Sequence, residues 1–165
     1  MLVALCICHA IFSQETKDGK TEAKNEVKLN LLMTVLKIPE ISYERILSNN
    51  LGLGLSAGFS FDNDALDINY QIIPYGRFYF GRKHGSGFFI EANAALVGFK
   101  EEYYVNYTYE YRTRDVTGFG VGFAIGGKFI NNNDFIGEFF LGCGNTFSKN
   151  DYIYPRIGVS IGKQF

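Results

Sequence analysis

Very few residues of this 165-residue sequence could take part in catalysis or metal binding. The two histidines are His9, in the apolar N-terminal segment, and His84, in a short turn expected between two strands. Asp62, Asp64 and Asp67 could offer hard oxygen ligands to a divalent cation. Closely spaced Asp and Asn residues are also ordinary turn formers, and we favour that interpretation. We therefore expect no catalytic residue, no metal site and no cofactor.

The sequence also gives no support for a phosphate-binding loop, a nucleic-acid-binding surface or a disulfide. The glycine-rich stretch 118–122 is not followed by the helical pattern of a phosphate-binding loop. Sixteen Lys and Arg against 17 Asp and Glu give a net charge of −1, which leaves no basic surplus to hold a phosphate backbone. We expect no nucleic-acid partner. Once the N-terminal segment is removed, Cys143 is the only cysteine, so no internal disulfide can form.

The elements that would position any site are strands. From Val27 onward, segments with a period of two are separated by turn clusters of Asn, Asp, Gly and Ser. The predicted strands are 26–36, 40–47, 51–61, 67–80, 87–99, 114–129, 135–147 and 152–165. Connections after the second, fourth and sixth strands are compact, and an even number of strands puts both chain ends on one side. The expected fold is all-β: an eight-stranded antiparallel up-and-down transmembrane β-barrel.

The apolar face of each strand distinguishes a soluble barrel, which hides it inside, from a membrane barrel, which shows it to lipid. In segment 114–129 one face carries Phe119, Val121, Phe123, Ile125 and Phe129. The opposite face is mostly glycine, and segment 51–61 repeats this arrangement. Glycine suits the lumen of a barrel of about eight strands, because side chains fill such an interior. The alternative is a glycine-rich β-sandwich.

The same alternation between the two faces of each strand points a small set of ionisable residues toward the lumen. They are Glu44, Arg77, Glu91, Lys128, Glu138 and Arg156, three acids and three bases. An isolated charge inside a closed barrel would cost several kcal/mol, so these groups are predicted to pair. The expected neutral partners are Asn69, Gln71, Asn93, Tyr75 and Tyr79. We favour a structural salt-bridge network, and a proton path or gate is the alternative.

Both chain ends carry features of export to the bacterial outer membrane. Residues 1–13 are interpreted as a signal peptide, 14–25 as a flexible polar lead-in and 26–165 as the barrel. The chain ends inside its last predicted strand on Phe165, after alternating apolar residues. That ending resembles the C-terminal signature of outer-membrane proteins, which the barrel assembly machinery recognises. The expected location is the bacterial outer membrane, and the expected partners are its lipid and that machinery.

The most distinctive local feature is a tyrosine-rich segment between Lys100 and Arg114. Its tyrosines are Tyr103, Tyr104, Tyr107, Tyr109 and Tyr111. The segment is expected to extend the fifth and sixth strands as a hairpin beyond the bilayer. Tyr109 and Tyr111 continue the outward face of the sixth strand and could join the interfacial aromatic belt. The exposed tyrosines of the segment could instead form a contact surface for a protein, a glycan or lipopolysaccharide.

Three short motifs resemble a known family. They are Ile41-Ser42-Tyr43-Glu44-Arg45, Ile73-Pro74-Tyr75-Gly76-Arg77-Phe78-Tyr79-Phe80 and Gly87-Phe88-Phe89-Ile90-Glu91. From Asn25 to Phe165 the chain is similar to small outer-membrane barrels of Bacteroidota called the domain of unknown function 3575. The resemblance implies location and architecture rather than a reaction, so a non-enzymatic structural or partner-binding role is expected. Pro74 and Pro155 should make their strands locally irregular, because proline cannot donate to a ladder.

Two other functions stay open. One is a soluble exported ligand-binding barrel of the lipocalin type, although lipocalins carry a Gly-x-Trp motif and this chain has no Trp. The other is an outer-membrane enzyme that modifies lipids.

Overall fold

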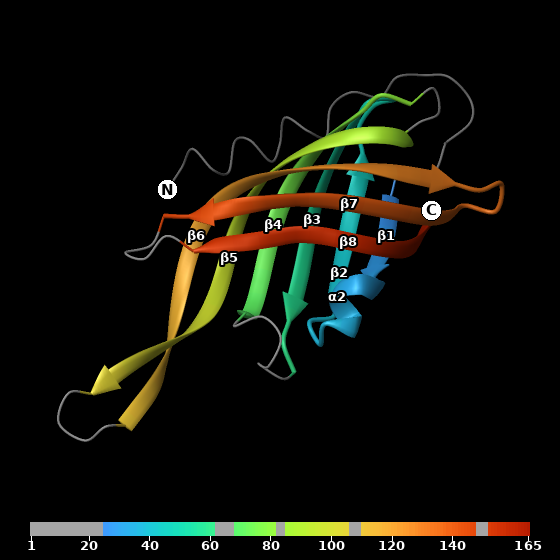
Figure 1. Ribbon diagram of the computed structural model, residues 1–165. Helices are drawn as coiled ribbons and strands as arrows, with labels where there is room; N and C mark the ends of the chain where they lie inside the picture. The colour runs from blue at the N-terminus through green and yellow to red at the C-terminus, as the bar shows by residue number, and fades with distance from the viewer. Residues whose placement is uncertain (1–24, 62–67, 82–84, 106–109, 148–151) are drawn as a thin grey trace, which may run out of the picture.

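Eight antiparallel strands close into a barrel, in which each strand pairs with its sequence neighbours and the first pairs with the last (Figure 1). The computed structural model describes residues 25–61, 68–81, 85–105, 110–147 and 152–165, and the side chains within these ranges except those of 101–113. The strands are β1 (Asn25–Asn30), β2 (Glu40–Ile46), β3 (Leu51–Phe59), β4 (Ile68–Tyr79), β5 (Gly87–Val105), β6 (Glu110–Ile130), β7 (Phe135–Thr146) and β8 (Ile153–Gln164). The predicted fold is confirmed. The predicted signal peptide and nearly all of the lead-in lie outside the described residues.

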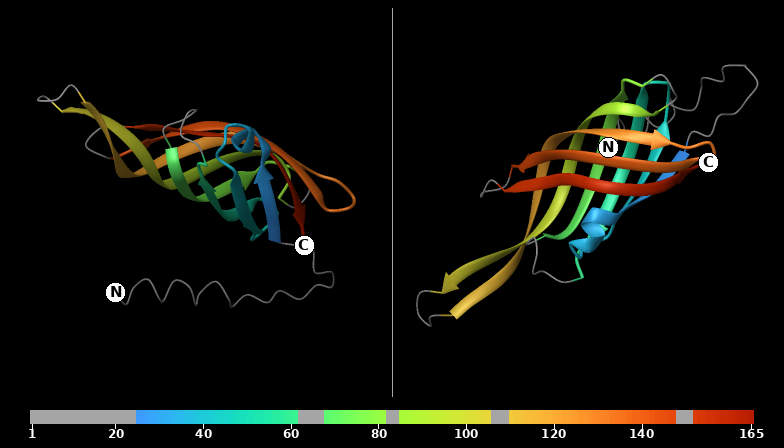
Figure 2. Two further views of the ribbon diagram at one scale, coloured as in Figure 1. Left: turned by 90° about the horizontal axis from the view of Figure 1, so that it is seen from below. Right: turned by 45° about the vertical axis from the view of Figure 1, so that its right-hand side comes forward.

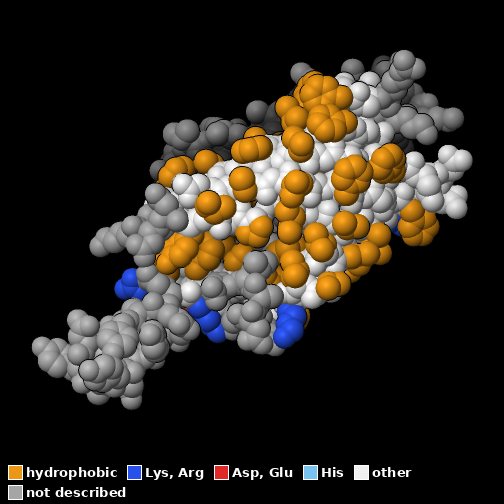
Figure 3. Space-filling model, viewed as in Figure 1, with side chains coloured by type: hydrophobic (Ala, Val, Ile, Leu, Met, Phe, Trp, Pro, Cys, Tyr) orange, Lys and Arg blue, Asp and Glu red, His pale blue; other side chains and the backbone are white. Residues whose placement is uncertain are grey.

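The outer wall of the barrel is apolar, as the period-two pattern predicts. On β6, Phe119, Phe123 and Phe129 expose 57%, 64% and 65% of their surface, whereas Ala124 and Lys128 between them are buried. On β3, Leu53 and Leu55 are exposed in the same way. Figure 3 shows apolar side chains spread across the barrel wall. The predicted parity, with large apolar residues outside, is therefore confirmed on these strands.

The first predicted strand, 26–36, is wrong in its second half. β1 ends at Asn30, and the short helix α2 (Leu31–Val35) follows. The Asn30 side chain accepts a hydrogen bond from the backbone N–H of Met33 at 3.3 Å, which satisfies a donor of the first helical turn. Met33 is buried in an apolar cluster at this end of the barrel. An apolar run this short fits a strand or a helix equally well, and the cap and the buried Met33 decide it. No helix among the described residues is long and apolar enough to span a membrane.

The helix leaves part of β8 without a partner strand on its β1 side. Pairing of β1 with β8 ends at Asn30↔Ser160, although β8 begins at Ile153. The Asn30 amide donates to the carbonyl of Ile157 at 3.0 Å and so satisfies one acceptor on this open edge. Asn30 therefore holds both the helix and the end of the β1–β8 seam.

The two prolines behave differently. The backbone of Tyr152 accepts from Thr146 on the β7 side, so the nitrogen of Pro155, three residues later, points to the open edge beyond β1. The pairing of β7 with β8 is regular at Cys143↔Pro155, so the predicted irregularity there is wrong. At Pro74 the pairs of β4 with β5 are interrupted between Ile72↔Leu96 and Tyr75↔Asn93 and resume in the same register. Only Pro74 disturbs its ladder.

Replacing Asn30 by alanine should lower the free energy of unfolding by about 1–3 kcal/mol, because it removes a helix cap and leaves the Ile157 carbonyl without its donor. Urea unfolding of the detergent-folded protein measures the loss. Asn30→Ser is the matched variant, since serine retains the cap but is too short to reach Ile157, and we expect it to lose about half as much. If Asn30→Ala unfolds at the wild-type urea concentration, Asn30 does not hold the seam.

The tyrosine-rich segment forms part of the sheet. β5 continues to Val105 and β6 begins at Glu110, in continuous register from Gly87↔Lys128 to Val105↔Glu110. The predicted strand ends at 99 and 114 are therefore wrong, while the predicted hairpin extension is confirmed. Figures 1 and 2 show this hairpin projecting beyond the rest of the barrel. Tyr107 and Tyr109 lie outside the described residues, as do the side chains of Tyr103, Tyr104 and Tyr111.

Candidate functional site

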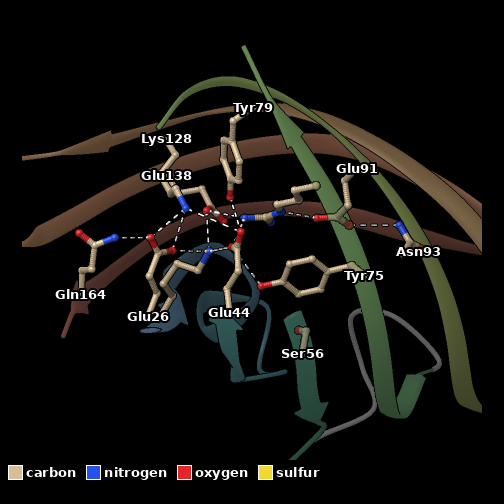
Figure 4. Close-up of polar contacts among 12 residues, drawn as sticks. Glu26, Glu44, Ser56, Tyr75, Tyr79, Glu91, Asn93, Lys128, Glu138 and Gln164 are labelled. Carbon is tan, nitrogen blue, oxygen red and sulfur yellow. Dashed lines mark hydrogen bonds and ion pairs between the residues drawn. The ribbon is translucent and has the colours of Figure 1, made fainter. Parts of the chain in front are cut away.

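The candidate site is the charged interior of the barrel. All six residues predicted to face the lumen, Glu44, Arg77, Glu91, Lys128, Glu138 and Arg156, are buried, with at most 4% of their surface exposed. They come from six strands, because alternate residues of every strand point to the barrel axis. The structure brings all six into one connected cluster of ion pairs, most of which Figure 4 shows.

Two lysines hold the part of the cluster nearer the chain ends. The Lys28 ammonium lies 2.6 Å from a carboxylate oxygen of Glu44 and 2.8 Å from one of Glu138. Lys128 donates to both carboxylate oxygens of Glu26, at 3.0 and 2.8 Å. Each ammonium is therefore shared or chelated by carboxylates, which offsets part of the cost of removing it from water.

Arg77 is the centre of the cluster. Its Nη1 lies 3.1 Å from Glu44 and 2.6 Å from Glu138, and its Nε donates to Glu91 at 2.8 Å. Its guanidinium also stacks over the ring of Phe89, 4.2 Å from the centroid. One planar cation thus joins three carboxylates from three strands and also stacks on an aromatic ring, a combination that suits a guanidinium.

Arg156 continues the cluster toward the α2 end. Its Nε donates to Glu91 at 2.7 Å and its Nη1 to Glu40 at 2.8 Å. Glu40 also accepts hydrogen bonds from Ser56 and from the Gln71 amide. The connected side chains include at least one from every strand, so the network ties the whole wall together.

Beyond the charges, the interior becomes apolar. The cluster that includes Met33 of α2 is formed by Met33, Ile38, Ile68, Ile73, Ala95, Val97, Phe99 and Tyr154. Tyr154 donates to Asn93, which itself donates to Glu91, so the apolar and charged parts are joined. A second, smaller apolar cluster, formed by Ile46, Tyr79, Phe89 and Phe140, contacts the charged part through Arg77.

Three charged members of the cluster were not predicted: Glu26, Lys28 and Glu40, all of which are buried. The alternation signal was present, because Glu26 and Lys28 alternate with Val27 and Leu29, and Glu40 shares the parity of Glu44. The described network contains five carboxylates and four cations rather than the three of each that were predicted.

One predicted neutral partner, Asn69, lies elsewhere. It donates to Asp115 at 2.7 Å in an exposed contact. The pairing of β4 with β5 shifts between Ile68 and Tyr70, which changes the face that Asn69 occupies. Gln71, Tyr75, Tyr79 and Asn93 do contact the carboxylates, and Tyr79 donates to Glu44.

The chemistry open to this cluster is restricted by its contacts. Each of its carboxylates already lies against one or more cations, and none is accessible to a dissolved substrate. Within the described residues, no group of three or more His, Cys, Asp or Glu is arranged to hold a metal ion. The arrangement is suited to cohesion between strands.

Comparison with protein families gives the affiliation of the chain. Residues 2–164 match the family described as "Protein of unknown function (DUF3575)". The chain belongs to this family. The resemblance predicted from three short motifs is thus confirmed. The search of curated proteins gives no match.

A solved structure supports the fold of this DUF3575 chain. The crystal structure of the N-terminal β-barrel domain of Pseudomonas aeruginosa OprF aligns with a TM-score of 0.58 and 16% identity. The alignment covers 87% of the DUF3575 chain and 98% of the OprF chain. At this identity the likeness shows a shared barrel fold.

Proposed function

We propose that this DUF3575 chain is a non-enzymatic integral outer-membrane β-barrel with a plugged lumen, and that it has a structural or partner-binding role. The observation that carries the proposal is the distribution of side chains across the wall. Large apolar side chains such as Phe123 and Leu141 are exposed outside, while Arg77 and Lys128 are buried inside. A protein dissolved in water buries the first class and exposes the second. We infer that the outer wall of the barrel faces the hydrocarbon of a lipid bilayer rather than water.

The lumen is proposed to be filled rather than open. An eight-stranded barrel is just wide enough for its own side chains to occupy. Arg77 and Arg156 are among the largest fully buried side chains, and Met33 is buried beside the apolar residues at the α2 end. We infer that the charged network and the apolar cluster together form the plug.

Export, assembly and partner binding complete the proposal. Residues 1–13 would direct export, and Phe165, whose side chain is 60% exposed, would be presented to the barrel assembly machinery. The β5–β6 hairpin would place the tyrosine-rich segment 100–114 outside the cell. There it would contact a protein or glycan partner.

Replacing Phe123 by arginine distinguishes a membrane barrel from a soluble one, because the change should destabilise a membrane barrel and should make a soluble barrel more soluble. Phe123 is 64% exposed on the outer face of β6. A cation on the lipid face of a barrel costs about 2–4 kcal/mol near the bilayer midplane. We expect Phe123→Arg to lower the urea midpoint of the protein folded in lipid vesicles and to reduce its amount in outer membranes.

Phe123→Leu is the matched control and should behave as wild type in both assays. A soluble barrel would gain solubility from Phe123→Arg and would purify as a monodisperse monomer without detergent. That result would contradict the membrane proposal.

A further inference from the structure

A groove lies on the outer wall over β2, β1, β8 and β7, next to the chain ends. It has a volume of about 630 Å³ and is lined mainly by Val27, Leu29, Ile41, Phe135 and Ile161, with Lys163 at one side. These residues belong to the outer face, while Lys28 of the charged network and the inward-facing Ile136 contribute the remainder of the lining together with Gly162. The groove is therefore a feature that the structural role of the interior does not explain.

The strand register orders the outer face into rows. The row farther from the chain ends consists of Ile41, Leu29, Ile161 and Gly137, which are partners in adjacent strands. The next row consists of Tyr43, Val27, Lys163 and Phe135. Arg45, Asn25 and Phe165 form the row at the chain ends. Polarity thus increases from the apolar row toward the rim.

Gly137 lies beside the groove, as the strand partner of Ile161 in its lining. A Cβ added at Gly137 would meet no atom within 4 Å, and its partner on β8 is the exposed Ile161. The apolar row therefore has a gap where its fourth side chain would stand. A gap bordered by branched aliphatic side chains accepts a flexible hydrocarbon chain.

Two cations lie closer to the rim than the apolar row: Lys163, which lines the groove, and Arg45 on β2, which lies beyond its lining. Lys163 lies 5.8 Å from the ring centroid of Phe135, and the Arg45 guanidinium donates to the Asn25 side chain at 3.3 Å. Their strands are separated by β1, which puts their backbones about 10 Å apart. In the described parts of β1, β2, β7 and β8, every carboxylate points inward and is buried: Glu26, Glu40, Glu44 and Glu138. Two other carboxylates of the described residues lie next to this face: that of Asp134, in the turn before β7, and the terminal carboxylate of Phe165, in the row at the chain ends.

We propose that this groove binds an anionic glycerophospholipid, with an acyl chain along the apolar row and the headgroup phosphate at Lys163 and Arg45. The order of the rows carries the proposal. The cations lie at the rim, where headgroups lie, and the gap lies toward the middle of the wall, where acyl chains lie. Long cationic side chains at such a position reach the interface while their stems cover apolar surface. The proposal rests on the membrane location proposed above and adds a lipid class and a site to it.

Native mass spectrometry of the detergent-folded protein, titrated with phosphatidylglycerol, tests the site. We expect one phosphatidylglycerol to bind about fivefold more tightly than phosphatidylethanolamine. Gly137→Leu, which fills the gap, and Lys163→Gln, which removes a cation, should each weaken phosphatidylglycerol binding about fivefold.

The matched control is Gly76→Leu. Gly76 lies in a second outer groove, of about 440 Å³, formed over β3, β4 and β5 with no charged residue in its lining. This variant should bind phosphatidylglycerol as wild type does. Equal binding by all variants, or equal binding of the two lipids, overturns the lipid site.

A heat-modifiable gel band checks that each variant is folded. A folded barrel that requires detergent but does not discriminate between the lipids overturns the lipid site alone. A protein that is a soluble monomer without detergent overturns both the site and the membrane location.

Discussion

Arg77→Met should lower the free energy of unfolding by about 3–5 kcal/mol, the usual cost of removing one partner from a buried ionic cluster. Arg77 is the cation shared by Glu44, Glu91 and Glu138. Methionine fills a similar volume, so the loss would come from the charge. The described network already holds five carboxylates against four cations, and this change leaves it with three cations. Urea unfolding in lipid vesicles, followed by circular dichroism, measures the loss.

The cost depends on charge balance, so a second change should relieve it. Glu138→Gln combined with Arg77→Met removes one carboxylate together with the cation that lies 2.6 Å from it. We expect the double variant to be less destabilised than the sum of the two single variants, by about 1–3 kcal/mol. Arg114→Met, which removes an exposed cation at the far end of β6, should change stability by no more than about 0.5 kcal/mol. If Arg77→Met is no more destabilising than Arg114→Met, the network does not hold the barrel together.

The fold could be predicted because a barrel wall has only two faces. Alternation between large apolar residues and glycine, as in β6, reports which side of the wall a residue occupies without any tertiary information. The same alternation placed Glu44, Arg77 and Glu138 in the lumen. It could not state which cation meets which carboxylate, because strands far apart in sequence meet across the barrel: Lys28 and Glu138 are 110 residues apart.

The wrong predictions arose where the local sequence is compatible with two structures and contacts with other strands decide between them. Leu31–Val35 has no polar alternation, so a cap at Asn30 and a buried Met33 decide between helix and strand. Asn69 changes face because of a register shift between Ile68 and Tyr70, which depends on how β5 pairs and not on β4 alone. Contacts of this kind depend on the pairing of all the strands in the closed barrel, which the sequence of one segment does not specify.

Gly142→Ala and Gly137→Ala should change stability in opposite directions, although both add one methyl group to β7. An added Cβ at Gly142 would lie 2.6 Å from the Cβ of Ala124 and would also contact the backbone oxygen of Phe123 on the paired strand. Because the contact includes backbone, β6 and β7 would have to separate. We expect a loss of about 3 kcal/mol, at the upper end of the cost of overpacking.

At Gly137 the same methyl group has open space in front of it. The substitution there restricts the unfolded chain without straining the folded one, so a gain of about 0.4–1 kcal/mol is expected. Urea midpoints of the two variants, measured side by side in the same vesicles, give the comparison. Two losses of equal size would mean that β7 does not tolerate alanine on either face, and the assignment of inward and outward residues would lose its support. A loss at Gly142 with a gain at Gly137 would show that the close approach of β6 and β7, and not strand propensity, requires glycine at position 142.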